Sequence, residues 1–145
     1  MYKWPLDRIH VTQKFAERPE VYKKFGLKAH NGCDLRTRFL NSPLGHRYVT
    51  AIADGVIEEI RYDISGYGCH IRHRLDDGTL VIYGHLSKPY VAIKSRVKAG
   101  DRIGLSGNTG FSSAPHLHLE IRPAPLKSNN GYAGAVDPLP YFPKL

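Results

Sequence analysis

Short runs of β-branched and aromatic residues, separated by turn residues, are the dominant pattern of this chain. The runs predict strands over residues 49–52, 55–61, 70–74 and 79–83. Asp77-Gly78 separates the last two runs and predicts a hairpin between them. Helical periodicity is weak, and the best helix candidate, residues 19–24, is short. The pattern therefore predicts an all-β fold with an antiparallel sheet core.

The length and composition are those of one folded domain, which we expect to span residues 1–145. Hydrophobic residues make up 41% of the chain, which excludes a disordered or collagen-like protein. Prolines gather near the C-terminus, so we expect an extended tail that wraps the domain. No apolar run approaches the roughly 20 residues of a membrane helix. We therefore expect no membrane insertion, and we expect a monomer.

Charge and cysteine content narrow the possible partners only slightly. The chain carries 21 basic and 13 acidic residues, a formal net charge of +8. This favours an anionic partner: nucleic acid, anionic lipid or an acidic cell-wall polymer. Cys33 and Cys69 cannot form a four-cysteine zinc site, and we expect both to be reduced and buried. The N-terminal residues lack the apolar segment of a secretory signal peptide, so none is expected in this chain.

Two histidine motifs have the spacing of metal ligands. Side chains alternate faces along a strand, so His116 and His118 would share one face while the leucines between and after them face the core. His30 and Asp34 can converge on one point, with Gly32 allowing the backbone to bend between them. Each motif alone has a simpler interpretation, namely two surface histidines, or a turn histidine beside a capping aspartate.

Together, the two motifs predict a catalytic metal site. A catalytic zinc ion typically has three protein ligands and one open position for water. His30 and Asp34 supply two ligands, and the His116/His118 pair supplies a third with one histidine to spare. His85 follows a strand-like run and adds another imidazole. Such a set could activate water and protonate a leaving amine. The residues alone do not say which histidine of the pair is the ligand.

With these motifs, the chain resembles the LytM/lysostaphin family of zinc metallopeptidases, peptidase family M23. The resemblance extends over nearly the whole chain, with the motifs in the same order as in the family. The matching stretches are residues 11–15, 30–35, 51–56, 83–87, 97–110, 116–120 and 136–138.

The resemblance implies roles for the motif residues. His30, Asp34 and His118 would bind zinc, and His85 and His116 would be catalytic, taking a proton from water and returning it to the departing amine. Which of the two is the general base stays open. The implied activity is endopeptidase cleavage of peptide cross-links in bacterial peptidoglycan, in cell-wall lysis or remodelling, including a phage lysin. The implied fold is an antiparallel sheet with a loop-walled groove, of the duplicated-hybrid-motif type, with zinc on the groove floor.

Two other function classes compete with this hypothesis. Some members of the family have lost their ligands and only bind peptidoglycan or regulate partners, but here all three ligand positions and both catalytic histidines are present. Nucleic-acid binding is disfavoured because the basic residues are dispersed and no recognised motif is present. We therefore expect peptidoglycan as partner and action in the cell envelope, by a phage-delivered or processed form. The cross-link, D-alanyl-diaminopimelate or glycine bridge, is left open.

Several residues near these motifs receive more modest interpretations. Cys33 is expected in the core, and Glu120 either orients the His118 imidazole or forms a plain salt bridge. Family members often carry a tyrosine shortly before the first zinc histidine. Tyr22 lies eight residues before His30 and cannot be aligned, so no catalytic tyrosine is predicted.

The remaining aromatic and histidine residues receive structural interpretations. Tyr67 is a candidate groove residue, whereas Tyr83 is expected to pack in the core. His70 and His73 are expected to be surface residues or hydrogen-bonded ones. The glycine-rich stretches 65–68 and 106–110 are expected to form groove walls or tight turns.

Overall fold

Strands dominate the structure, as the sequence pattern predicts, and the strand pairings are antiparallel. The computed structural model describes residues 1–41 and 44–145. One nine-stranded sheet has the order β1-β2-β9-β6-β5-β4-β7, and β8 joins it through β6 and pairs with β3. The strands are β1 (Val11–Gln13), β2 (Cys33–Arg36), β3 (Tyr48–Thr50), β4 (Gly55–Asp63), β5 (Gly68–Leu75), β6 (Leu80–Pro89), β7 (Arg96–Val97), β8 (Arg102–Ser106) and β9 (His116–Arg122).

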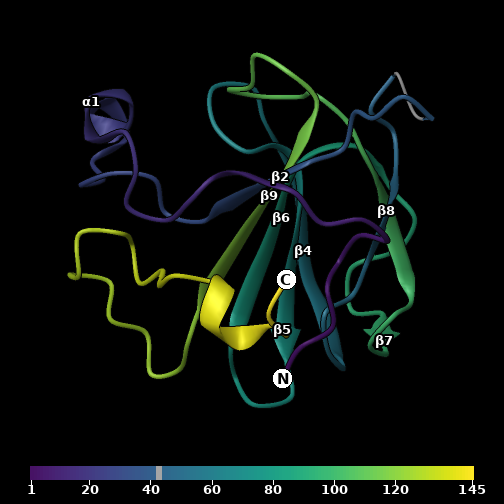
Figure 1. The fold of residues 1–145 in the computed structure, drawn as a ribbon. Coiled ribbons are helices and arrows are strands. Elements are labelled where there is room, and N and C mark those ends of the chain that lie inside the picture. Colours follow the sequence, from purple (N-terminus) through teal and green to yellow (C-terminus); the bar gives the residue numbers. More distant parts are fainter. Residues whose placement is uncertain (42–43) are drawn as a thin grey trace.

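The predicted helix is present but short. α1 (Pro19–Tyr22) passes directly into the 3-10 turn η1 (Lys23–Phe25), so together they cover the predicted segment. Figure 1 shows α1 standing to one side of the sheet, at the end of a long N-terminal excursion. A second 3-10 turn, η2 (Leu139–Tyr141), lies near the C-terminus. Among the described residues, no helix has the length and apolar character needed to cross a membrane.

The hairpin predicted at Asp77-Gly78 joins β5 to β6. Gly78 has a φ of +90°, a conformation that suits glycine in a tight turn. The Asp77 carboxylate accepts a hydrogen bond of 2.8 Å from the Thr79 backbone N–H, which closes the turn from its own side chain. The local sequence therefore fixes this connection, and with it the pairing of the two longest neighbouring strands.

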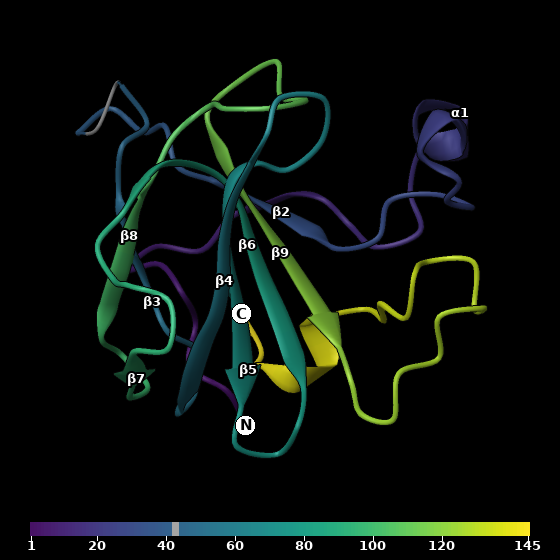
Figure 2. The same cartoon turned by 180° about the vertical axis from the view of Figure 1, so that it is seen from behind.

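The core lies on the face of the sheet that carries Leu117 and Leu119. Both side chains are fully buried, together with Tyr83 and Ile71 from the adjacent strands β6 and β5. The two chain termini lie near each other (Figures 1 and 2), and the Tyr2 N–H donates to the Tyr141 carbonyl. The C-terminal tail thus packs against the sheet as expected, with η2 as its only helical turn among the described residues.

His70 and His73 are both buried, so the surface alternative is wrong for them. Strand β5 lies between β4 and β6 inside the sheet, and most of its residues are buried. The hydrogen-bonded alternative is confirmed: His70 Nδ1 lies 3.0 Å from the Gly68 carbonyl, and His73 Nδ1 lies 3.2 Å from the Tyr83 hydroxyl. Tyr83 is buried, as expected from the sequence.

Candidate active site

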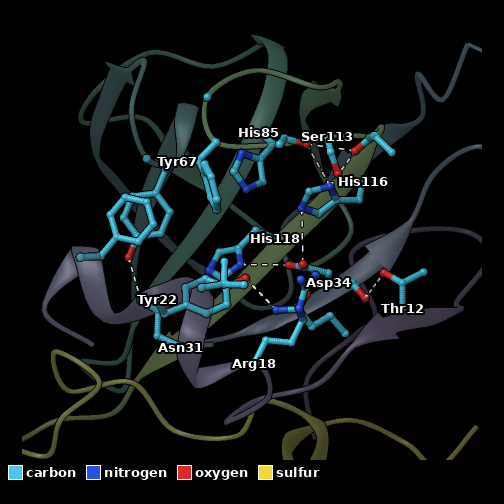
Figure 3. Close-up of a pocket in the computed structure, with 18 of the residues that line it drawn as sticks. Thr12, Arg18, Tyr22, Asn31, Asp34, Tyr67, His85, Ser113, His116 and His118 are labelled. Carbon is cyan, nitrogen blue, oxygen red and sulfur yellow. Dashed lines mark hydrogen bonds and ion pairs between the residues drawn. The ribbon is translucent and has the colours of Figure 1, made fainter. Parts of the chain in front are cut away.

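Three neighbouring strands deliver four of the five predicted site residues to one cleft with a volume of about 1140 Å³. The fifth, His30, lies on the segment just before β2 and is buried. Asp34 on β2 pairs in register with His118 on β9, and His118 pairs with Gly84 on β6. Figure 3 shows His118 and Asp34 facing each other on the cleft floor, with His85 and His116 on the side toward the 107–115 loop. The face shared by His116 and His118, opposite the two leucines, is the one predicted from strand alternation.

His30, Asp34 and His118 form a compact triangle of potential ligand atoms. His30 Nε2 lies 3.2 Å from Asp34 Oδ1. His118 Nδ1 lies 3.1 Å from the same oxygen and 3.1 Å from His30 Nε2. Bonds of roughly 2.0–2.1 Å in a tetrahedral zinc site place ligand atoms roughly 3.3 Å apart. The three atoms are therefore spaced as the ligands of one metal ion would be.

Hydrogen bonds on the far side of both rings orient the ligand nitrogens. His30 Nδ1 donates to the Lys14 carbonyl at 2.9 Å, which leaves Nε2 toward the centre of the triangle. His118 Nε2 lies 3.2 Å from the Glu120 carboxylate, which leaves Nδ1 toward the centre. Metal-binding histidines commonly donate their other ring N–H to a carboxylate or carbonyl in this way. The two rings thus present different nitrogens to one point.

The charges of Asp34 and His118 depend on each other. Burial opposes ionisation of Asp34, but hydrogen bonds from His118 and His30 hold its pKa well below the usual range. Burial likewise opposes the charged form of His118, but hydrogen bonds to Asp34 and Glu120 raise its pKa to about 9. The Asp34 carboxylate is therefore ionised. A metal ion bound at Nδ1 of His118 must displace the proton that this nitrogen otherwise holds.

His116 and His85 lie beside the triangle without joining it. His116 Nδ1 donates to the Ala114 carbonyl at 2.8 Å, and its Nε2 lies 3.5 Å from Asp34 Oδ2. His85 Nδ1 donates to the Thr109 carbonyl at 2.7 Å, which leaves its Nε2 as an acceptor. The two rings are 4.6 Å apart between centroids. Burial, reinforced by the neighbouring His118 and His116, lowers the pKa of His85 to about 3, so this ring is neutral.

A change of strand partner positions His85. Strand β6 pairs with β9 up to Gly84 and with β8 from Leu86 onward, so His85 occupies the bend between the two pairings. Its φ of +60° is left-handed, which costs a non-glycine residue about 1 kcal/mol. The bend places the ring in the cleft rather than over a flat sheet.

Glu120 is the centre of a buried polar network behind His118. Its Oε2 accepts hydrogen bonds from Asn31 Nδ2 at 2.9 Å and from the Tyr67 hydroxyl at 2.7 Å, as well as facing His118. Its Oε1 accepts from Arg122 Nε at 2.6 Å. Although burial opposes its ionisation, bonds from His118 and the charge of Arg122 lower the pKa of Glu120. The structure combines the two alternatives predicted for Glu120, since it contacts the imidazole and also pairs with an arginine.

Gly32 lies at a bend of the backbone, as expected, and a second constraint also favours glycine there. Its φ angle is not positive, so the bend alone does not require glycine. A Cβ at this position would lie 2.5 Å from the Leu119 carbonyl and 2.7 Å from His118 Cε1. Such contacts are too short for any side chain, so glycine is also needed for the close approach of the segment before β2 to β9.

Tyr22 is the residue that sequence reasoning left undecided. Its ring lies 5.1 Å from the His30 ring, and its hydroxyl accepts a hydrogen bond of 2.7 Å from Gln13 Nε2. Burial and the Asp34 charge raise its pKa to about 12. Figure 3 shows Tyr22 at the edge of the cleft. The segment through α1 folds back to bring it there, which spacing along the sequence cannot reveal.

Two glycine-rich loops form a wall of the cleft, as expected. Gly68 and Gly110 both have positive φ, and a Cβ on Gly110 would lie 2.3 Å from the Gly68 backbone nitrogen. Thr109 connects its loop to strands β5 and β6, since its hydroxyl donates to the Leu86 carbonyl and accepts from the Cys69 N–H. Tyr67, which belongs to the first of these loops, lines the cleft. Both cysteines are free and buried, and burial raises the pKa of Cys33, which is a core residue as expected.

Comparison with known proteins agrees with this geometry. Residues 28–138 match the model of peptidase family M23. An uncharacterized metalloprotease of Haemophilus influenzae is 46% identical over 120 residues, 82% of this chain and 24% of that protein. Peptidoglycan DD-endopeptidase ShyC of Vibrio cholerae is 35% identical over 118 residues, 81% of this chain and 25% of its own length. This chain thus spans about a quarter of the length of these relatives.

The fold is likewise similar to a solved peptidase domain. The catalytic domain of the antimicrobial peptidase lysostaphin from Staphylococcus simulans superposes with a TM-score of 0.67 at 35% identity, covering 79% of each chain. The family match extends over most of the chain. It includes the three residues of the triangle and the two histidines beside it. The chain belongs to peptidase family M23.

Proposed function

We propose that this chain is a zinc-dependent endopeptidase that hydrolyses peptide cross-links of bacterial peptidoglycan. The observation that carries the proposal is the triangle of His30, Asp34 and His118, whose ligand atoms lie 3.1–3.2 Å apart beside two further histidines. Family membership implies a metallopeptidase. The name of the Vibrio cholerae relative supports peptidoglycan as the substrate.

His30 Nε2, Asp34 Oδ1 and His118 Nδ1 are the proposed zinc ligands. Two imidazole nitrogens and one carboxylate oxygen suit Zn²⁺, and three protein ligands are typical of catalytic rather than structural sites. When bound, zinc would polarise the scissile carbonyl and lower the pKa of a water to about 7. Glu120 and the Lys14 carbonyl hold the ligand rings in the required tautomers.

His85 and His116 are the proposed proton-transfer residues. Each ring donates through Nδ1 to a backbone carbonyl, so each Nε2 can accept a proton. A neutral imidazole at either position would take the proton of the attacking water and then return it to the departing amine. The imidazolium formed between these events would also stabilise the negative charge of the tetrahedral transition state.

The site of action and the partners follow from the same proposal. The activity requires access to the cell envelope, and the net charge of +8 would concentrate the protein on an anionic wall in a salt-dependent manner. We propose that residues 1–145 act as a single peptidase domain and as a monomer. Peptidoglycan, rather than nucleic acid, is the proposed partner.

Digestion of purified peptidoglycan tests the proposal directly. The zinc-loaded protein should release peptides with new termini, identified by mass spectrometry, and a chelator should stop the release until zinc is restored. His116→Ala should retain zinc and lose hydrolysis. Binding to the wall without new termini by the zinc-loaded protein would contradict the proposal and favour a binding module. A salt-dependent shift of DNA mobility without hydrolysis would favour the nucleic-acid alternative.

A further inference from the structure

We infer that Arg36 and Arg38 bind a free carboxylate of the substrate peptide beside the scissile amide. The inference rests on the proposed function and specifies the substrate class within it. Cross-links in which the residue flanking the cleaved bond carries a carboxylate, as diaminopimelate does, would be preferred over uncharged glycine bridges.

Strand β2 places Arg36 next to the proposed metal ligands. Side chains two apart on a strand share a face and are about 7 Å apart. Arg36 therefore lies on the same face as Asp34, whereas the buried Cys33 and Leu35 face the core. Arg36 is also the register partner of His116 on β9. The Arg36 guanidinium group thus lies on the next same-face position of the strand after Asp34, beside the position where the amide would be cleaved.

The cleft continues past the triangle toward these arginines. Arg36 and Arg38 line the main cleft together with Asp34 and His116. The same two arginines line an adjoining hollow of about 520 Å³, whose other walls are Arg8, Phe39 and Leu40. A peptide lying across the triangle and extending in this direction would pass both guanidinium groups.

Arg36 and Arg38 differ from the other arginines in lacking a partner. Within residues 1–41 and 44–145, both side chains are exposed, and neither forms an ion pair or a cation–π contact. Each of the others is engaged, either with an acidic side chain, as in Arg18, Arg47, Arg61, Arg72, Arg74, Arg96 and Arg122, or over an aromatic ring, as in Arg8 and Arg102. Two unengaged guanidinium groups in one cleft are therefore a specific feature of this site.

A guanidinium is suited to recognise a carboxylate. Its planar set of N–H donors matches the two oxygens and forms charge-assisted hydrogen bonds. In a D-alanyl-diaminopimelate cross-link, the carbon that carries the departing amine also carries a free carboxylate, so a charge lies within a few bonds of the cleaved amide. A glycine bridge offers no charge there. The Asp34 carboxylate does not compete for the arginines, because His118 and His30 engage it.

Two synthetic cross-linked peptides that differ in one group provide the test. Both contain the D-alanyl-diaminopimelate bond, one with the free carboxylate beside the departing amine and the other with a carboxamide. We expect the zinc-loaded protein to cleave the carboxylate peptide with a kcat/KM about fivefold higher. In the double variant Arg36→Gln/Arg38→Gln the ratio should fall to about one, through a higher KM for the carboxylate peptide alone. Arg102→Gln removes one charge outside the cleft and should keep the ratio.

The outcomes separate this inference from the proposed function. Equal cleavage of the two peptides by the native chain, or a preference that survives in the double variant, would overturn the inference and leave the peptidase function intact. A defect of the double variant on whole walls but not on the peptides would also overturn it, because attraction to anionic wall polymers would then explain the arginines. If the zinc-loaded chain cleaves neither these peptides, nor a glycine peptide, nor purified walls, the proposed function fails as well.

Discussion

Buried histidines lie on both faces of the sheet, a cluster in the cleft and His73 alone on the core face, and the two sides behave differently. In the cleft, His30, His118 and their neighbours surround Asp34. On the core face, His73 on β5 lies against Tyr83 on β6. Tyr83 is the register partner of Leu119, next to His118, and therefore points to the side opposite that ring. His30, His73 and His118 are all inaccessible or nearly so, so burial alone does not distinguish a candidate ligand from a packing residue.

The difference lies in what the free ring nitrogens face. In the cleft, acceptors behind His30 and His118 turn the opposite nitrogens toward a common centre. On the core face, the Tyr83 hydroxyl accepts from the Ile52 N–H and lies 3.2 Å from His73 Nδ1. His73 Nε2 has no hydrogen-bond partner among residues 1–41 and 44–145. That nitrogen faces Gly55, where a Cβ would lie 2.7 Å away. The candidate metal-binding histidines are therefore distinguished by ring nitrogens that are oriented toward one point, and not by the mere presence of histidine.

Removing Asp34 should have the largest effect on hydrolysis, because this carboxylate joins the histidines of the cleft. Asp34→Ala leaves two imidazoles without their shared carboxylate and the proposed metal site with two ligands. Loss of several kcal/mol of transition-state stabilisation predicts a fall in hydrolysis of about 10³-fold or more, with loss of bound zinc. Metal analysis and peptide release from purified walls measure both effects. Retention of stoichiometric zinc in this variant would exclude Asp34 as a ligand.

Replacing His85 should separate proton transfer from metal binding within the cleft group. His85→Gln keeps a polar side chain of similar reach but removes the basic nitrogen. General acid–base catalysis contributes about 10²–10⁴-fold, so kcat should fall within that range while the zinc content is unchanged. The matched change on the core face, His73→Gln, should leave kcat per folded molecule near that of the native chain. Equal losses in the two variants would show that His85 acts through folding alone.

The sequence was a good guide to the cleft group because its geometry is local. Strand alternation places His116 and His118 on one face, and the short spacing of His30 and Asp34 keeps those two together. It was a poor guide to His73, because alternation assigns a residue to a face but does not say what covers that face. Tyr22 depends in the same way on the path of the chain through α1, a tertiary feature. The choice of His118 over His116 as ligand came from the family resemblance.

Weakening the network behind His118 should have a smaller effect than removing a ligand. Glu120→Gln keeps the shape but removes the charge that faces His118 and Arg122. Loss of such an outer partner typically lowers metal affinity by about 10–100-fold. Competition for zinc against a chromophoric chelator measures the change. Glu58→Gln, which removes an exposed partner of Arg74, is the control and should leave zinc affinity unchanged, since surface ion pairs contribute little.

Replacing His73 should have the smallest effect on activity, and it tests the core side of the comparison. His73→Leu removes one hydrogen bond to Tyr83 and the Nε2 atom, which has no partner in the part of the chain that the structure describes. The two consequences oppose each other, so we expect the free energy of unfolding at pH 7 to change by no more than about 1 kcal/mol. Zinc content and hydrolysis at pH 7 should match those of the native chain. Loss of zinc in this variant would show that the two faces are coupled.

The same variant should alter the response of stability to acid. Burial lowers the pKa of His73 from 6.5 to about 4 in the folded chain. Between these pH values the unfolded chain binds more protons at this position, so stability is retained above pH 6.5 and falls as the pH decreases toward 4, by about 3 kcal/mol. His73→Leu removes this share of the loss, and urea unfolding of the two chains across that range measures it. Parallel stability profiles would mean that His73 is protonated without cost, and it would then be as well solvated as an exposed histidine despite lying in the core.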